Sequence, residues 1–477
     1  MQHMTLANIA AAVGGALYQA EGHEEQEVTC AVIDSRKMEE GGLFFAAPGE
    51  RVDGHRFINQ VFSQGAACVV TQKTPEEVSQ EQGEAQNWGP YILVEDSYAA
   101  LRKMAAYYRS ILSIPIVGIT GSVGKTSTKE FIAGVLSRRY RVLKTEGNFN
   151  NEIGLPLTLL RIREEHEAAV VEMGISDFGE MSRLGAMARP DICVITNIGQ
   201  CHLENLHDRA GIFKAKTEIF DYMQEGGQIC LNGEDDLLAM VSVVNGSPVH
   251  HFGISEREDL EVYATDIENE GLFGSRAQMH FAGACADPLT GNAGVPVTIK
   301  LPGQHMVINA MAAAMVGRLL HMTAEQIAEG IACVEPVNGR SHLMKVKDMV
   351  VIDDCYNANP ISTKAALDLL VTASGRKVAI LGDMFELGER SGQMHAEVGA
   401  YAVEQGVDAL FCVGEQSRYM YDAALERYDG AQDIRYFSDR DELLESLSGL
   451  VEPGDTVLIK ASHGMEFHRI VERLQTI

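Results

Sequence analysis

The sequence predicts an α/β protein of three domains. The chain has 477 residues, and at roughly 150 residues per domain this length favours about three of them. Hydrophobic residues make up 46% of the chain and charged residues 22%, which is typical of a globular protein and excludes a disordered chain or a coiled coil. Apolar strand-like runs alternate with helical patterns over much of the chain, as in parallel sheets covered by helices. We therefore expect domains over residues 1–112, 113–335 and 336–477.

The first domain, residues 1–112, is predicted to be a small α/β unit of short strands and helices. Apolar residues with helical spacing predict an amphipathic helix at its start. They are Leu6, Ile9, Val13 and Leu17. Residues 74–86 are acidic and rich in glutamine, which predicts a solvated loop or an exposed helix face. Since the first basic residue is Arg36, the apolar start lacks the charged region of a signal peptide.

The second domain, residues 113–335, is predicted to hold a mostly parallel sheet. Its strand candidates are the apolar runs 115–120, 168–173, 191–197 and 228–232. Turns and alternating apolar residues over 260–300 predict an antiparallel insertion or an extension of the sheet. A helix rich in alanine and methionine is expected at about 307–320.

The third domain, residues 336–477, is predicted to have a Rossmann-like doubly wound fold, because strands and helices alternate regularly. The strand candidates are 349–353, 377–381, 409–413 and 456–459, and the helical patterns are 361–373, 391–405, 417–427 and 439–449. The segment 334–339 is the expected hinge between the second and third domains.

The strongest chemical motif is the segment TGSVGKTS at 120–127, which follows an apolar strand and precedes a helix at 129–136. Glycine-rich loops in this context turn backbone N–H groups toward phosphates, and the helix N-terminus adds positive potential. Lys125 would reach the β- and γ-phosphates of a nucleotide, and the hydroxyl of Thr126 would bind Mg²⁺. A stricter form of this P-loop motif requires glycine at Ile119, so a chance glycine-rich turn is the alternative.

Acidic and basic residues follow the next strands. Glu172 ends the apolar run 168–173, where its carboxylate would either complete a Mg²⁺ site beside Thr126 or be an ordinary strand-end acid. His202 follows the next strand, although a lone histidine is more often structural than a ligand. Lys216 lies on an amphipathic helical stretch, for which a solvated charged face is the ordinary explanation.

Two further segments carry polar side chains that suit a substrate. Asn148 and Asn151 lie in a polar stretch bounded by glycines, and their amides both donate and accept hydrogen bonds, although such residues also form plain turns. In the third domain Asp354 follows a strand, and Arg340 at the hinge could move onto a γ-phosphate when the domains close. Residues 381–389 form a second acidic loop after a strand.

The net charge of −28 argues against a nonspecific partner of nucleic acid or of an anionic membrane, since phosphate groups are held by an excess of Lys and Arg. No stretch of the sequence is apolar enough to suggest a membrane span. The nine cysteines show no metal-type pairing, which predicts a reduced, cytoplasmic protein.

Taken together, these motifs resemble the Mur ligase family, whose members are ATP-dependent amide ligases of peptidoglycan precursor synthesis. The resemblance covers essentially the whole chain. Segments 147–156, 356–360 and 382–388 resemble the branch that adds D-alanyl-D-alanine to a UDP-muramoyl tripeptide. Asp34-Ser35-Arg36 and Asp53-Gly54-His55 resemble the UDP-binding first domain found in the family.

The resemblance implies an activity. The enzyme would join D-Ala-D-Ala to the C-terminal carboxylate of UDP-N-acetylmuramoyl-tripeptide through an acyl phosphate, giving UDP-MurNAc-pentapeptide, ADP and phosphate. The implied cofactors are ATP and two Mg²⁺ ions, with a carbamate on Lys216. The first domain would bind the UDP-sugar and the second ATP, while the third would complete the ligase. A cytoplasmic monomer that neither binds nucleic acid nor inserts into a membrane is expected.

The resemblance also implies a role for each candidate residue. The expected catalytic residues are Lys125, Lys216 and His202. The expected nucleotide contacts are Gly121, Ser122, Gly124, Lys125, Thr126, Ser127, His305, Asn309, Arg340 and Asp354. The expected metal ligands are Thr126, Glu172, His202 and Lys216, and the expected substrate contacts are Ser35, Arg36, Asn148 and Asn151.

Two other functions stay open. Another ligase of the same superfamily is one of them, although a diaminopimelate- or lysine-adding enzyme usually carries an Asp-Asn-Pro-Arg motif in its last domain that is missing here, and Asp34-Ser35-Arg36 argues against a folylpolyglutamate synthase. The other is a P-loop switch that binds partners and makes no product, which would leave two of the domains without a use.

Overall fold

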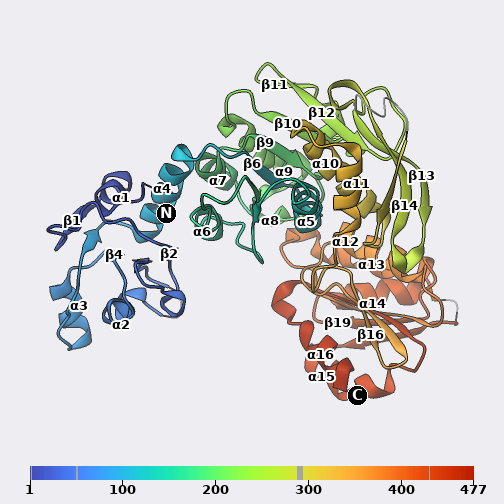
Figure 1. Cartoon of the computed structure of the whole chain (residues 1–477). Helices are drawn as coiled ribbons and strands as arrows, with labels where there is room; N and C mark the ends of the chain where they lie inside the picture. The colour runs from blue at the N-terminus through green and yellow to red at the C-terminus, as the bar shows by residue number, and fades with distance from the viewer. Residues whose placement is uncertain (2, 50–51, 287–293, 429, 477) are drawn as a thin grey trace.

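Three sheets organise the chain, and helices cover them (Figure 1). The structure is a computed structural model that describes residues 1, 3–49, 52–286, 294–428 and 430–476. The predicted α/β class with three domains is confirmed. Within the described residues, no helix is both long enough and apolar enough to cross a membrane.

The first sheet has the strand order β1-β5-β4-β3-β2, in which β1 is antiparallel to β5 and the other neighbours are parallel. Its strands are β1 (Ala16–Tyr18), β2 (Ala31–Val32), β3 (Leu43–Phe45), β4 (Cys68–Thr71) and β5 (Tyr91–Leu93). Its helices are α1 (Leu6–Val13), α2 (Ile58–Ser63), α3 (Pro75–Gln82) and α4 (Ser97–Ile111). The acidic stretch 74–86 forms α3, in which Val78 alone is buried, as an exposed helix face requires.

The first helix is shorter than its apolar spacing predicted. α1 begins after Thr5, whose hydroxyl accepts a hydrogen bond from the N–H of Asn8 at 3.2 Å. It ends at Val13, because Gly14 adopts the left-handed φ of 73° that commonly terminates helices. Leu17 lies in strand β1, so the prediction that it belongs to the helix face was wrong.

Helix α4 joins the first domain to the second. The buried Arg109 guanidinium donates hydrogen bonds to the carbonyl of Ala188 and to Asp191 Oδ2, both at 2.8 Å. The apolar residues around this helix form one continuous core cluster that extends from Met4 in the first domain to Val249 in the second. The two domains therefore share a core.

The second sheet has the order β15-β14-β13-β12-β10-β9-β6-β8-β7, with the short β11 paired to β12. Its strands are β6 (Ile116–Thr120), β7 (Val142–Lys144), β8 (Ala168–Glu172), β9 (Ile192–Ile195), β10 (Gln228–Asn232), β11 (Val243–Val244), β12 (Ser247–Gly253), β13 (Val262–Asn269), β14 (Ser275–Phe281) and β15 (Val295–Ile299). Strands β6, β8, β9 and β10 confirm the four predicted ones. The antiparallel pairs β13–β14 and β14–β15 confirm the extension predicted over 260–300, of which residues 287–293 lie outside the described residues.

Helices cover both faces of this second sheet. They are α5 (Lys125–Leu136), α6 (Gly154–Leu159), α7 (Glu180–Ala188), α8 (Leu203–Leu206), α9 (Arg209–Thr217), α10 (Gln304–Leu319) and α11 (Ala324–Ala332). Helix α10 corresponds to the predicted alanine- and methionine-rich helix, and its apolar residues form one core with those of α5 and β6. Helix α5 begins directly at Lys125, one turn earlier than predicted.

The third sheet has the order β16-β17-β21-β18-β19-β20 and is parallel except for the edge strand β16. Its strands are β16 (His342–Val346), β17 (Met349–Asp353), β18 (Lys377–Gly382), β19 (Ala409–Val413), β20 (Asp433–Phe437) and β21 (Thr456–Lys460). Its helices are α12 (Pro360–Leu370), α13 (Ser391–Glu404), α14 (Ser417–Glu426), α15 (Arg440–Ser446) and α16 (His468–Thr476). All four predicted strands are confirmed. Both edge strands and α16 were missed, since the edge strands are only partly buried and lack a continuous apolar run.

Candidate active site

A cavity of about 460 Å³ lies between the second and third domains, where loops that follow the strands of both parallel sheets meet. Ligands of open α/β sheets bind at the carboxyl ends of the strands, so this is the expected place for a site. Most of the predicted residues line it. They are Ser122, Gly124, Lys125, Thr126, Ser127, Asn151, Glu172, His202, His305, Asn309, Arg340 and Asp354.

The phosphate-binding loop connects β6 to α5. Gly124 has φ of 86° at the N-terminus of α5, a conformation that glycine adopts without strain. The ammonium of Lys125 donates a hydrogen bond to the carbonyl of Gly121 at 2.8 Å and so bridges the loop. Gly121 does not line the cavity, because it packs against Thr196, whose Oγ1 would lie 1.9 Å from an added Cβ. Gly121 therefore helps to set the shape of the loop without contributing to the cavity wall.

The end of β8 supplies a carboxylate beside this loop. Glu172 is only 2% exposed, and its Oε2 accepts a hydrogen bond from the Thr126 hydroxyl at 3.1 Å. Its Oε1 accepts from the amide of Asn150 at 2.9 Å. Asn150 was not among the predicted residues, although it stands in the same polar stretch as Asn148 and Asn151.

The pair of Thr126 and Glu172 fits a Mg²⁺ ion. Within the described residues, no group of three or more His, Cys, Asp or Glu side chains could by itself hold a metal. Mg²⁺ usually keeps several waters and binds one or two carboxylates together with substrate phosphates, so it does not need such a group. A hydroxyl and a carboxylate 3.1 Å apart beside a phosphate-binding loop provide the expected protein oxygens.

Lys216 lies on α9 and is 1% exposed, so it is not on the solvated charged face that helical patterns usually carry. No hydrogen bond or ion pair joins its ammonium to any residue that the structure describes, and the residue is absent from the cavity wall. Burial, together with the nearby charge of Lys125, lowers the pKa of Lys216 to about 8. A substantial fraction of this amine is therefore neutral near pH 8, whereas an ordinary lysine is almost wholly charged.

His202 lies in the loop after β9, directly before α8, and lines the cavity. Its Nδ1 forms an ion pair with Oε2 of Glu386, which belongs to the acidic loop 381–389 of the third domain. The contact with His202 lowers the pKa of Glu386. No local pattern predicts this contact between the two domains.

The third domain contributes a cationic wall. Lys460, buried at the end of β21, pairs with Asp354 Oδ2 at 2.5 Å and donates to the carbonyl of Asn357 at 3.0 Å. The guanidinium of Arg340 stacks on the ring of Tyr356 at 3.8 Å from its centroid. Lys460 was missed, and its position directly after a predicted strand was the available signal.

The start of α10 forms the remaining wall. Asn309 lies against the phosphate-binding loop, since an added Cβ on Gly124 would be 3.1 Å from its Oδ1. His305 lies one turn earlier, and burial lowers the pKa of its imidazole. Both predicted residues thus lie beside the loop.

The predicted substrate residues are less close together. Asn151 lines the cavity, and its side chain accepts hydrogen bonds from the backbone at the start of α6. Asn148 is exposed and lies outside the cavity wall. Ser35 is buried in the first domain, and Arg36 is exposed and paired with Asp34; neither lines the cavity.

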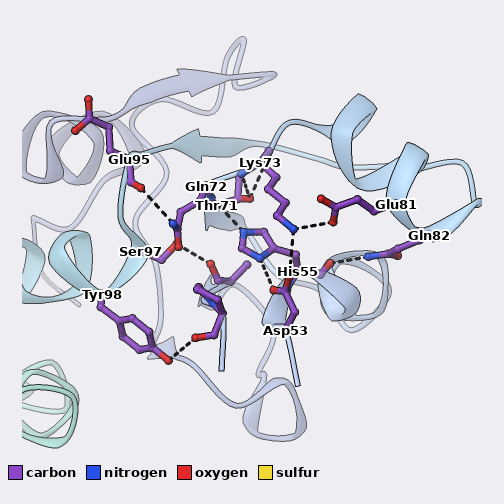
Figure 2. A network of polar contacts seen from close by, with 12 residues as sticks. Asp53, His55, Thr71, Gln72, Lys73, Glu81, Gln82, Glu95, Ser97 and Tyr98 are labelled. Carbon is purple, nitrogen blue, oxygen red and sulfur yellow. Dashed lines mark hydrogen bonds and ion pairs between the residues drawn. The ribbon is translucent and has the colours of Figure 1, made fainter. Parts of the chain in front are cut away.

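Figure 2 shows that the side chains of Asp53 and His55 form a network inside the first domain. His55 is 2% exposed, and its Nδ1 bonds Asp53 Oδ1 at 2.5 Å while its Nε2 accepts from the N–H of Gln72 at 3.3 Å. Lys73 adds ion pairs to Asp53 at 3.2 Å and to Glu81 at 2.6 Å. Both ring nitrogens of His55 are thus used within the protein, so this residue supports the fold of the first domain.

Replacing His55 with alanine is expected to lower the free energy of unfolding of the first domain by about 2 kcal/mol, because the buried N–H of Gln72 loses its acceptor. Scanning calorimetry measures the change. His23→Ala is the matched control, since His23 is exposed. A His55→Ala protein that melts like the unaltered chain would contradict this role.

Three family models match the chain. They are the Mur ligase family catalytic domain at residues 27–109, the Mur ligase middle domain at residues 119–317, and the Mur ligase glutamate ligase domain at residues 339–463.

Known proteins match over nearly their whole length. The UDP-N-acetylmuramoyl-tripeptide–D-alanyl-D-alanine ligase of Bacillus subtilis is 34% identical over 475 residues, which is 98% of each chain. The crystal structure of MurF from Acinetobacter baumannii has a TM-score of 0.85 at 30% identity and covers 99% of both chains. MurF from Thermotoga maritima in complex with ADP has a TM-score of 0.76 at 28% identity, over 94% of this chain and 97% of that one.

Proposed function

This chain belongs to the Mur ligase family, and on that basis we propose that it joins D-alanyl-D-alanine to UDP-N-acetylmuramoyl-tripeptide in an ATP-dependent reaction of peptidoglycan precursor synthesis. One observation carries the proposal. A single cavity brings the phosphate-binding loop and Glu172 of the second domain to face Arg340 and Asp354 of the third.

The reaction starts from a carboxylate, which is a poor acyl donor because its negative charge repels nucleophiles. A carboxylate oxygen of the tripeptide attacks the γ-phosphorus of ATP, and the bond to the β-phosphate oxygen breaks, which yields an acyl phosphate and ADP. The neutral amine of D-Ala-D-Ala then attacks the acyl carbon. The tetrahedral intermediate loses inorganic phosphate, and the amine proton is released.

Residues of two domains support these steps. Lys125 can exchange its hydrogen bond to the carbonyl of Gly121 for the β- and γ-phosphate oxygens. Arg340, held on the ring of Tyr356, brings a second positive charge from the third domain. Closure of that domain also excludes the water that would hydrolyse an acyl phosphate.

Thr126 and Glu172 are the proposed ligands of one Mg²⁺ ion, and His202 is a proposed ligand of a second. When bound, the ions neutralise charge on the transferring phosphoryl group. Lys216 is proposed to carry a carbamate. Carbamate formation requires a neutral amine, and the lowered pKa of Lys216 supplies one.

The first domain, residues 1–112, is proposed to bind the UDP-sugar through Ser35 and Arg36, with residues 113–335 binding ATP and residues 336–477 completing the ligase. Asn148 and Asn151 are proposed to contact the substrate. In support, Lys37 of the first domain lies 5.7 Å from the ring centroid of Phe149, so the two regions adjoin. We further propose a cytoplasmic monomer, and the free thiols of the described cysteines support the cytoplasmic location.

Phosphate release tests the function directly. A ligase releases phosphate from ATP only when both UDP-tripeptide and D-Ala-D-Ala are present, and it forms UDP-pentapeptide in equal amount. Omitting either substrate is the control. Steady hydrolysis without the two substrates would instead support a P-loop switch.

A further inference from the structure

An ion pair joins the second and third domains at the edge of the cavity. It connects Nδ1 of His202 with Oε2 of Glu386. The Nδ1 atom is buried and lies against the carboxylate without the geometry of a hydrogen bond to any described residue, while the Glu386 side chain is about half exposed. The contact therefore exists only while the third domain lies against the second.

The surroundings hold both partners in place. His202 and Glu386 have φ of 51° and 62°, a left-handed backbone that few residues other than glycine adopt. Leu203, next to His202, packs against the apolar core of the third domain. Gly388 of the third domain packs against Glu204 of the second, since a Cβ added to Gly388 would lie 3.5 Å from the Cα of Glu204. Two strained loops thus meet across the domain boundary.

A contact at one nitrogen of an imidazole ring affects what the other nitrogen can bind. A neutral imidazole carries its proton on one nitrogen and accepts or binds a metal with the other. With the Glu386 carboxylate against Nδ1, His202 has Nε2 left for a ligand, and no hydrogen bond to a described residue occupies that atom. Metal-binding histidines usually donate their other N–H to a carboxylate, which fixes the tautomer and the orientation of the ring.

We propose that Glu386 is a positioning residue that couples closure of the third domain to the orientation of His202. The inference rests on the proposed function, in which His202 binds the second Mg²⁺ ion. Closure brings the carboxylate against Nδ1, from where it can accept the Nδ1–H and leave Nε2 for the metal. Opening withdraws the carboxylate, so the second metal site is complete only in the closed enzyme.

Mn²⁺ is the probe for this coupling, and its binding to the full chain in the presence of a non-hydrolysable ATP analogue is measured by electron paramagnetic resonance. Glu386→Ala is expected to weaken the second Mn²⁺ equivalent about tenfold. Glu386→Gln is expected to weaken it by an intermediate factor, since the amide oxygen can take the place of the carboxylate oxygen without its charge. Glu389→Gln is the matched control, because Glu389 is exposed in the same loop and forms no ion pair with a described residue.

Nitrogen-15 spectra of the histidine-labelled chain give a second measurement, the tautomer of His202. If Glu386 had only a structural role, its replacement would leave this tautomer unchanged. His202 is expected to be protonated on Nδ1 in the unaltered closed protein and to shift toward the Nε2-protonated tautomer in Glu386→Ala. A Glu386→Ala protein with unchanged Mn²⁺ affinity and tautomer overturns the inference.

His202→Ala separates this inference from the proposed function. If His202→Ala weakens the second Mn²⁺ while Glu386→Ala does not, the positioning role is wrong and the metal role of His202 stands. If His202→Ala binds Mn²⁺ as the unaltered chain does, the metal role is wrong and the inference falls with it.

Discussion

Lys125→Ala is expected to lower the rate of ligation by about 10³-fold, because the charge that faces the transferring phosphoryl group is lost. The melting temperature is expected to change little, since the ammonium makes one hydrogen bond, to the carbonyl of Gly121. ADP release measured with saturating UDP-tripeptide and D-Ala-D-Ala reports the rate, and calorimetry reports the stability.

Lys144→Ala is the matched control for this change. Lys144 is an exposed lysine near α5 that pairs with Glu130 on the surface, so its loss should leave ligation unchanged. Turnover close to normal in the Lys125 variant would refute the assignment of the phosphate-binding loop.

Lys216→Ala is expected to lose at least about 10²-fold in rate, and short carboxylates or bicarbonate are expected to restore part of the rate by replacing the negative charge of the proposed carbamate. Lys214→Ala is the control, because Lys214 lies two residues earlier on α9 and is exposed. A fully active Lys216→Ala protein would remove the carbamate from the mechanism.

The pH dependence of protein stability gives an independent test of the lowered pKa of Lys216. Burial holds the pKa of Lys216 at about 8, against 10.5 for a free side chain, so the folded state loses this proton first. The unaltered protein should therefore gain stability as pH rises from about 8 to about 10.5. In CO₂-free buffer at pH 7, Lys216→Met should be more stable by roughly 3 kcal/mol, and this advantage should vanish near pH 10.5.

The parts of this fold that could be predicted are those with a strong local signal. Strands such as β8 and β19 are continuous apolar runs because they are buried on both faces. The place of Lys125 between a strand and a helix follows from the glycine-rich motif alone. Edge strands such as β20 are half-solvated, and their mixed composition hides them.

The arrangement of the site could be predicted only in part, because side chains distant in sequence create it. The position of Lys460 directly after a predicted strand is the one local signal, and only the fold places this lysine beside Asp354. The burial of Lys216 likewise depends on how α9 packs, and its amphipathic surroundings suggested a solvated face instead. The contact of His202 with Glu386 depends on how two domains are placed relative to each other, and hydrophobic periodicity in the sequence does not predict that placement.

The apolar core that the first two domains share around α4 sets a limit on motion. Rotating one of these domains against the other would break the core that they share, so the distance between the first domain and the phosphate-binding loop is set by the fold. The third domain has core clusters of its own, so its movement would leave that distance unchanged.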